Sequence, residues 1–228
     1  IGGIAMAGII GIVKSWKIIV EAVSLAGREF GGKKEARKSE TERTQRDIPM
    51  RWVTIGIIVA LLLTFLFFYL DVMHGNLLFA LVAILVVSVI TFLFTTVAAN
   101  AIAIVGTNPV SGMTLMTLIL ASVIMVAVGL NGTSGMVAAL IMGGVVCTAL
   151  SMAGGFVTDL KIGYWLGSTP RKQETWKFLG TLVSAATVAG VIMILNKTYG
   201  FTDGTLAAPQ ANAMAAVIEP LMSGNGAP

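Results

Sequence analysis

The stretch VGTNPVSGMT, at residues 105–114, contains the residue types of a turn although both flanks are almost entirely apolar. Asn108 could cap a helix that begins at Pro109, because asparagine caps helices well and proline fits the first helical turn. A helix N-terminus presents free N–H groups and a partial positive charge, which favour bound carboxylates. The stretch is therefore a candidate substrate-binding site. Its candidate residues are Gly106, Thr107, Asn108, Pro109, Ser111 and Gly112.

Carboxylates inside apolar segments are the usual proton carriers of membrane proteins, and this sequence offers few of them. Glu219 is the only one inside an apolar segment, and Asp159 lies at the end of another. These two residues are the candidates for proton coupling. For Glu219 an exposed helix end is the alternative, because charged groups are rarely buried and Pro220 follows directly.

Residues for metal binding or covalent chemistry are scarce. His74 is the only histidine and Cys147 the only cysteine. A metal site normally draws on three or four ligands, and a covalent nucleophile needs an adjacent base. The methionines, including Met113 and Met116 on one helix face, are more typical of core packing. The sequence therefore predicts no metal, no cofactor and no enzyme activity.

The elements that carry these residues must lie in a membrane. Hydrophobic residues make up 56% of the chain and charged residues only 11%, with a mean hydropathy of +0.90. No Asp, Glu, Lys or Arg occurs between Asp71 and Asp159, a stretch that holds several spans of about 20 residues each. These runs lack the two-residue alternation of barrel strands, so helices are favoured. We expect an all-α transmembrane fold, a polytopic helical bundle in the lipid bilayer.

The basic residues predict which loops share a side of the membrane. The net charge is +4, and 8 of the 15 Lys and Arg residues fall within residues 28–51. Because they occupy one loop rather than a basic face, no nucleic-acid partner is expected. The positive-inside rule makes this loop cytoplasmic, and a second basic segment, residues 159–174, follows it there. Residues 129–135 and 196–207 are then external.

The chain is predicted to divide into three regions. Residues 1–27 form a membrane helix with its inner extension, residues 28–51 a cytoplasmic charged loop, and residues 52–228 a C-terminal membrane domain of about five helices. Within this domain, Pro170 after Thr169 predicts a helix start with a hydroxyl cap. The segment DLKIGYWLGSTP before it is expected to be an inner loop or a short surface helix. Whether residues 205–223 cross the membrane is left open.

The segment that follows the candidate site, residues 113–128, is short for a membrane span. A helix that begins near Pro109 could therefore start inside the protein, as a discontinuous helix whose N-terminus faces an internal cavity. The alternative is a plain turn between two helices at the cytoplasmic surface, whose glycines only permit tight packing. Both interpretations fit the residues.

Three motifs occur in the order GTNPVSGMT, GGFVTDLKIGYWLGSTPRKQ and LAAPQANAMA. Together they resemble the C-terminal part of the oligopeptide transporter family, in its bacterial branch, which is related to the yellow-stripe-like metal-chelate transporters. The resemblance covers most of residues 50–225. In the second motif, Thr158 and Ile162 stand where the family usually has Gln and Thr.

The resemblance implies a secondary active transporter built from inverted repeats. Such a carrier would move oligopeptides or peptide-like metal chelates with protons across the bacterial cytoplasmic (inner) membrane. The resemblance also implies a missing N-terminal half as the partner of this part. The alternative function is a channel or pore with an Asn-Pro half-helix. Channels of that kind use one such pair in each repeat, whereas Asn108-Pro109 is the only Asn-Pro pair here.

Overall fold

The computed structural model describes residues 42–73, 75–106, 110–201 and 209–223, together with isolated helical positions between residues 10 and 24. Most of the predicted regions 1–27 and 28–51 lies outside the described residues. Every regular element in the described part is helical. The elements are a 3-10 turn Arg43–Gln45, α3 Met50–Phe67 with a π-helical turn Phe68–Val72, α4 Leu77–Val105, α5 Val110–Val128, α6 Gly132–Trp165, α7 Pro170–Tyr199 and α8 Pro209–Met222.

Four of these helical segments are long and apolar enough to cross a membrane. They are Met50–Val72, Leu77–Val105, Gly132–Trp165 and Pro170–Tyr199. A helix needs about 20 apolar residues to cross the hydrocarbon layer, and its own backbone hydrogen bonds satisfy every N–H and C=O on the way. The all-α, polytopic bundle expected from the sequence is confirmed.

The core lies where α4, α5 and α6 pack together, with α8 against α5 and α6. Large apolar side chains fill it, among them Leu118, Met125, Met142 and Leu150. Small residues let the helices approach: a Cβ built on Gly143 of α6 would collide with the Leu118 side chain of α5. Close approach of this kind replaces the hydrophobic drive that lipid removes. Core packing is confirmed for Met116, which is buried, and for Met113, which packs on the core, whereas Met193 of α7 is exposed.

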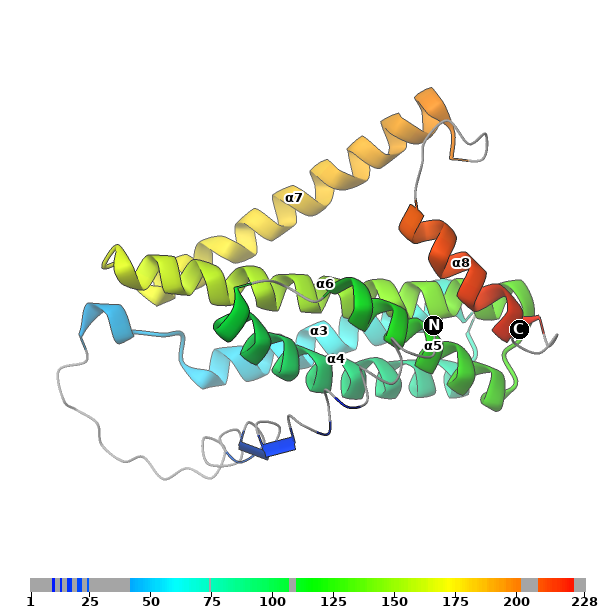
Figure 1. Ribbon diagram of the computed structural model, residues 1–228, viewed down its shortest axis with the longest axis horizontal. Coiled ribbons are helices and arrows are strands. Elements are labelled where there is room, and N and C mark those ends of the chain that lie inside the picture. The colour runs from blue at the N-terminus through cyan, green and yellow to red at the C-terminus, as the bar shows by residue number, and fades with distance from the viewer. Residues whose placement is uncertain are drawn as a thin grey trace.

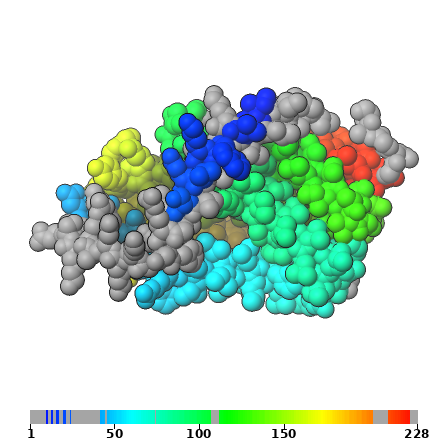
Figure 2. Space-filling view, turned by 90° about the horizontal axis from the view of Figure 1, so that it is seen from below, coloured from blue at the N-terminus to red at the C-terminus, as the bar shows by residue number. Residues whose placement is uncertain are grey.

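The start of α3 and three of the turns between helices lie at two opposite ends of the bundle (Figure 1). The start of α3 and the α6–α7 turn lie at one end, which the sequence predicts to be cytoplasmic. The α3–α4 and α5–α6 turns lie at the other. From the first of these ends α7 leans away from the bundle, and none of its residues is buried. Helix α3 also has no buried residue, and with α4 it forms a broad face of the molecule (Figure 2).

The expectation of a loop or separate surface helix before Pro170 was wrong. Helix α6 continues without interruption to Trp165, and the connection to α7 is short. Nothing in residues 159–165 breaks a helix, and the chain turns only where Gly167 adopts a left-handed φ of 70°. The helix start at Pro170 is confirmed. Its predicted hydroxyl cap is wrong, because the Thr169 side chain makes no capping hydrogen bond.

Helix α8 is too short to cross the membrane. Its 14 residues extend about 21 Å, against a hydrocarbon thickness of about 30 Å. Figure 1 shows it beginning part-way along α6, and Val217, Ile218 and Met222 of its second half are buried. Helix α8 thus packs on the bundle and is shorter than a membrane span, and residues 205–208 lie outside the described residues.

Candidate functional site

The candidate binding stretch is a break between two helices. Helix α4 ends at Val105, and Gly106 closes it in the left-handed conformation with φ of 76°, its N–H donating to the Ile102 oxygen at 2.8 Å. A glycine suits this position because other residues are strained there. Helix α5 then begins at Val110. The predicted break is present, whereas its role in binding stays a prediction.

The other predicted residues of the stretch are only partly described. Thr107, Asn108 and Pro109 lie outside the described residues, and so does the side chain of Ser111. The proposed cap by Asn108 is therefore a prediction still. Gly112 lies in the first turns of α5 and has open space where a Cβ would stand. Its surroundings leave room for a ligand or for a larger side chain.

Helix α5 begins well inside the length of the bundle. Gly143 of α6 lies against Leu118 of α5, which aligns the two antiparallel helices. The end of α6 at Trp165 lies about 33 Å along the helix from that contact, whereas the start of α5 at Val110 lies only about 12 Å from it. The start of α5 thus lies about 20 Å short of the end of α6. A start of α5 at membrane depth stays a prediction, because its 19 residues extend about 28 Å, close to the thickness of the hydrocarbon layer.

Hydroxyl groups concentrate on the inner faces of α4 and α5. Thr114, Thr117 and Ser122 are buried on α5, and the Thr117 hydroxyl donates to the Met113 oxygen at 2.9 Å. The Ser122 hydroxyl is fully buried and has no hydrogen-bond partner among the described residues. A buried hydroxyl without a partner costs about 1–3 kcal/mol, so each such group calls for an explanation.

Two more oxygens of this kind lie on α4. The hydroxyl oxygens of Thr91 and Thr95 are buried without a partner in the described part of the chain. These threonines are one turn apart on α4. The α3–α4 and α5–α6 turns lie at the same end of the bundle, and counting about 1.5 Å per residue from that end along each helix brings the threonines to about the level of the first turn of α5. The two threonines therefore lie at about the level of the start of α5, whereas Gly106, at the end of α4, lies about 16 Å beyond Thr95 along the same helix.

Sequence reasoning missed these hydroxyls. The signal was present, since Thr91, Thr95 and Ser122 are polar residues inside apolar runs. In a membrane helix, however, the lipid-facing side is as apolar as the core, so periodicity does not tell which side faces inward. Only the packing of α4, α5 and α6 reveals it.

The second candidate region is the junction between the end of α6 and the start of α7. Lys177 of α7 forms an ion pair with Asp159 of α6, with Nζ 2.5 Å from Oδ2. The Lys177 side chain is 21% exposed and that of Asp159 58%. The lysine also lies over the Phe156 ring, 5.2 Å from its centroid. Asp159, a predicted proton-coupling residue, is thus an ion-pair partner on the rim of the bundle.

The partner of Asp159 could not be read from the sequence, because the pair bridges a turn between two helices. Lys161 is two residues from Asp159 on α6, so the two side chains do not face one another. The Lys161 ammonium lies 5.8 Å from the Tyr164 ring centroid and 5.4 Å from that of Trp165. A cavity of about 340 Å³ opens beside the pair. It is lined by Phe156, Asp159, Leu160, Ile162, Gln173 and Lys177.

The end of the charged loop docks onto this junction. The Ile48 N–H donates to the Glu174 carboxylate at 2.9 Å, and the Arg171 N–H donates to the Arg46 oxygen at 3.0 Å. The Arg43 guanidinium donates to the Gly167 oxygen. These bonds connect residues more than 120 positions apart. The start of α3 is therefore tied to the α6–α7 turn.

Glu219, the other predicted proton-coupling residue, is exposed on α8. This position matches the exposed helix end that the sequence offered as the alternative, and a role in proton coupling stays a prediction. Among the residues that the structure describes, no group of three or more His, Cys, Asp or Glu side chains could hold a metal ion.

Comparison with known proteins gives one family. The family model described as OPT oligopeptide transporter protein matches residues 1–228, the whole chain. No curated protein and no solved structure matches the chain.

Proposed function

Because the chain belongs to the OPT oligopeptide transporter family, we propose that it acts as a secondary active carrier for oligopeptides or peptide-like metal chelates. The family match supports the general function, which is transport across a membrane. The finer proposal, which includes proton coupling and residence in a bacterial inner membrane, rests on the three sequence motifs and on the geometry of the helix break.

The observation that best supports a substrate site at the helix break is the depth at which α5 begins. Its N-terminus lies inside the length of the bundle, where the hydroxyls of Thr91 and Thr95 are buried without partners in the described residues. Irregular backbone at membrane depth is tolerated where it lines a cavity, and half-helix N-termini bind anionic substrate groups in this way. We assign the residues around Gly106 and Gly112 to the carboxylate end of the substrate.

The binding free energy must come from several donors. A helix N-terminus stabilises a partly buried anion by up to about 2 kcal/mol, which alone gives weak affinity. Hydroxyls of Thr107 and Ser111 would add hydrogen bonds to a carboxylate, and those of Thr91 and Thr95 could serve peptide groups. A peptide has one carboxylate and several amides, so a site with one helix end and a strip of hydroxyls suits it.

Proton coupling is proposed to act through Asp159, with Glu219 as the second candidate. Protonation of Asp159 would remove the charge that pairs with Lys177 across the α6–α7 junction. The lysine would then lose its partner, and the contact between the two helices would weaken. A proton could in this way change how α7 packs against the bundle, which is what alternating access requires.

The test is Asn108→Ala in the full-length carrier, with Asn100→Ala on α4 as the matched control. Loss of the cap should raise the KM for a carboxylate-bearing peptide about threefold to tenfold while the melting temperature stays near that of wild type. Asn100→Ala should leave the KM unchanged, because that residue precedes the break. Unchanged transport together with earlier melting of Asn108→Ala would make the stretch a structural cap only.

A further inference from the structure

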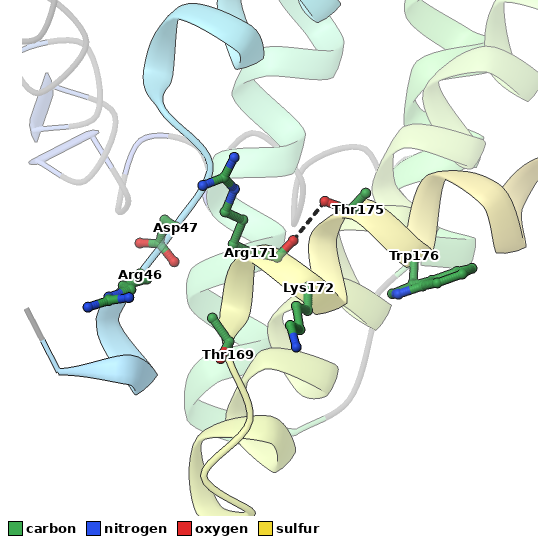
Figure 3. A pocket seen from close by; sticks show the side chains of 7 residues that line it. All are labelled: Arg46, Asp47, Thr169, Arg171, Lys172, Thr175 and Trp176. Atoms are coloured by element: carbon green, nitrogen blue, oxygen red, sulfur yellow. Dashed lines mark hydrogen bonds between the residues drawn. The ribbon is translucent and has the colours of Figure 1, made fainter.

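An open cleft lies beside the first two turns of α7, facing the segment before α3 (Figure 3). Its volume is about 730 Å³. It is lined by Arg46, Asp47, Thr169, Arg171, Lys172, Thr175 and Trp176. The cleft is separate from the helix break between α4 and α5, and none of its lining residues belongs to the proposed substrate site.

The side chains of the cleft favour an anion. Arg46, Arg171 and Lys172 contribute three positive charges, against one carboxylate from Asp47. Arg171 and Lys172 are both exposed. In Figure 3 they extend in different directions from the first turn of α7, with Arg46 and Asp47 on the facing segment. The positive end of the 30-residue helix α7 adds to this potential.

The backbone of α7 is not the main donor. The Arg171 N–H donates to the Arg46 oxygen at 3.0 Å, and the Lys172 N–H donates to the Thr169 oxygen at 3.0 Å. The Thr175 hydroxyl donates to the Arg171 oxygen at 2.8 Å. An anion in the cleft would therefore be held by the charged side chains of Arg171 and Lys172, which suit a phosphate.

Tryptophans place the cleft at the level of the lipid headgroups. Trp52 at the start of α3, Trp165 at the end of α6 and Trp176 in the cleft are all largely exposed at the same end of the bundle. Tryptophan is enriched at the membrane interface because its ring has an apolar body and a polar N–H. The cleft therefore opens where phosphates of a bilayer lie.

The surface next to the cleft is apolar. Phe178, Leu179 and Leu182 follow Trp176 along α7, and all three are exposed. No residue of α7 is buried in the described part of the molecule. A charged cleft that continues into an exposed apolar face fits a molecule with a phosphate at one end and acyl chains at the other.

We propose that this cleft binds the headgroup of an anionic phospholipid from the leaflet on the side of residues 28–51, with its acyl chains along α7. Basic pockets at helix ends on that side recognise such headgroups through their phosphates. Inorganic phosphate shares the same chemistry, but the apolar face beyond Trp176 gives the lipid the added contact. Bound there, the lipid would bridge α7 and the segment that holds Arg46.

The test measures binding of phosphatidylglycerol to the full-length carrier by native mass spectrometry, with phosphatidylcholine as the neutral reference. The double variant Arg171→Gln, Lys172→Gln should bind phosphatidylglycerol about 25-fold more weakly, since each basic residue near the surface contributes about fivefold. Asp47→Asn should bind it about fivefold more tightly, because the opposing carboxylate is removed. Binding of phosphatidylcholine should not change.

Lys161→Gln is the matched control, because Lys161 is a basic residue at the end of α6 that does not line the cleft. It should leave the affinity unchanged, and all variants should melt within a few degrees of wild type. An equal loss in Lys161→Gln, or no loss in the double variant, would overturn the site. Binding of inorganic phosphate as tight as that of phosphatidylglycerol would overturn the assignment to a lipid.

Discussion

Helices α6 and α7 are similar in sequence character but different in their surroundings. Both are more than long enough to span the membrane, and their most apolar stretches have nearly the same hydropathy. A third of that stretch is buried in α6, whereas none of it is buried in α7. The comparison shows that hydropathy determines entry into the membrane but does not determine which helix lies in the centre of the bundle.

Small residues alone do not explain the difference either. Gly143 of α6 lies against Leu118, while Gly180 and Gly190 of α7 have open space where a Cβ would stand. In lipid, helices associate through close packing and polar contacts rather than through the hydrophobic effect. A glycine therefore allows close packing but does not produce it, because a side chain such as Leu118 must fill the space beside it.

The largest effect is expected from filling the contact in α6. Gly143→Leu should destabilise the protein by about 1–3 kcal/mol, because the new side chain must displace the fully buried Leu118. Gly180→Leu in α7 is the matched control and should cost nothing, since its surroundings are open. Thermal unfolding in detergent would measure both. Equal destabilisation of the two variants would mean that α7 is packed as α6 is.

Much of the fold could be predicted from the sequence because it depends on local properties. The length of apolar runs predicted the spans, and proline and glycine predicted where α7 begins and where α4 ends. The length of α6 could not be predicted, because Asp159 and Lys161 within DLKIGYW have the composition of a loop. Nothing in that segment breaks a helix, so α6 continues to Trp165, and Asp159 pairs with Lys177 of α7.

The candidate site was predicted only in part, for the same reason. The helix break follows from residues next to one another, such as Gly106 and the Asn-Pro pair. The ion pair of Asp159 with Lys177 and the inward direction of Ser122 follow from packing between helices. These are properties of pairs of helices, and they become visible only once the helices are placed.

A smaller effect is expected at Ser122 in the centre of the bundle. Its buried hydroxyl has no partner among the described residues, so Ser122→Ala should raise the stability by about 1 kcal/mol. Ser184→Ala on α7 is the control and should change it by less than about 0.5 kcal/mol, because that serine is exposed and donates to the Thr181 oxygen. Destabilisation by Ser122→Ala would mean that its hydroxyl binds water or a ligand.

The smallest effect is expected where α6 and α7 meet. A double-mutant cycle of Asp159→Asn and Lys177→Met should give a coupling free energy of about 0.5–1 kcal/mol, since Asp159 is 58% exposed and solvent weakens the pair. Lys172→Met combined with Asp159→Asn is the control, because Lys172 lines a different cleft, and its coupling should be close to zero.

Transport assays on the same variants test whether Asp159 also carries a proton. If Asp159 carries the coupled proton, Asp159→Asn should abolish accumulation against a gradient while exchange continues; full accumulation would limit the residue to its structural pair.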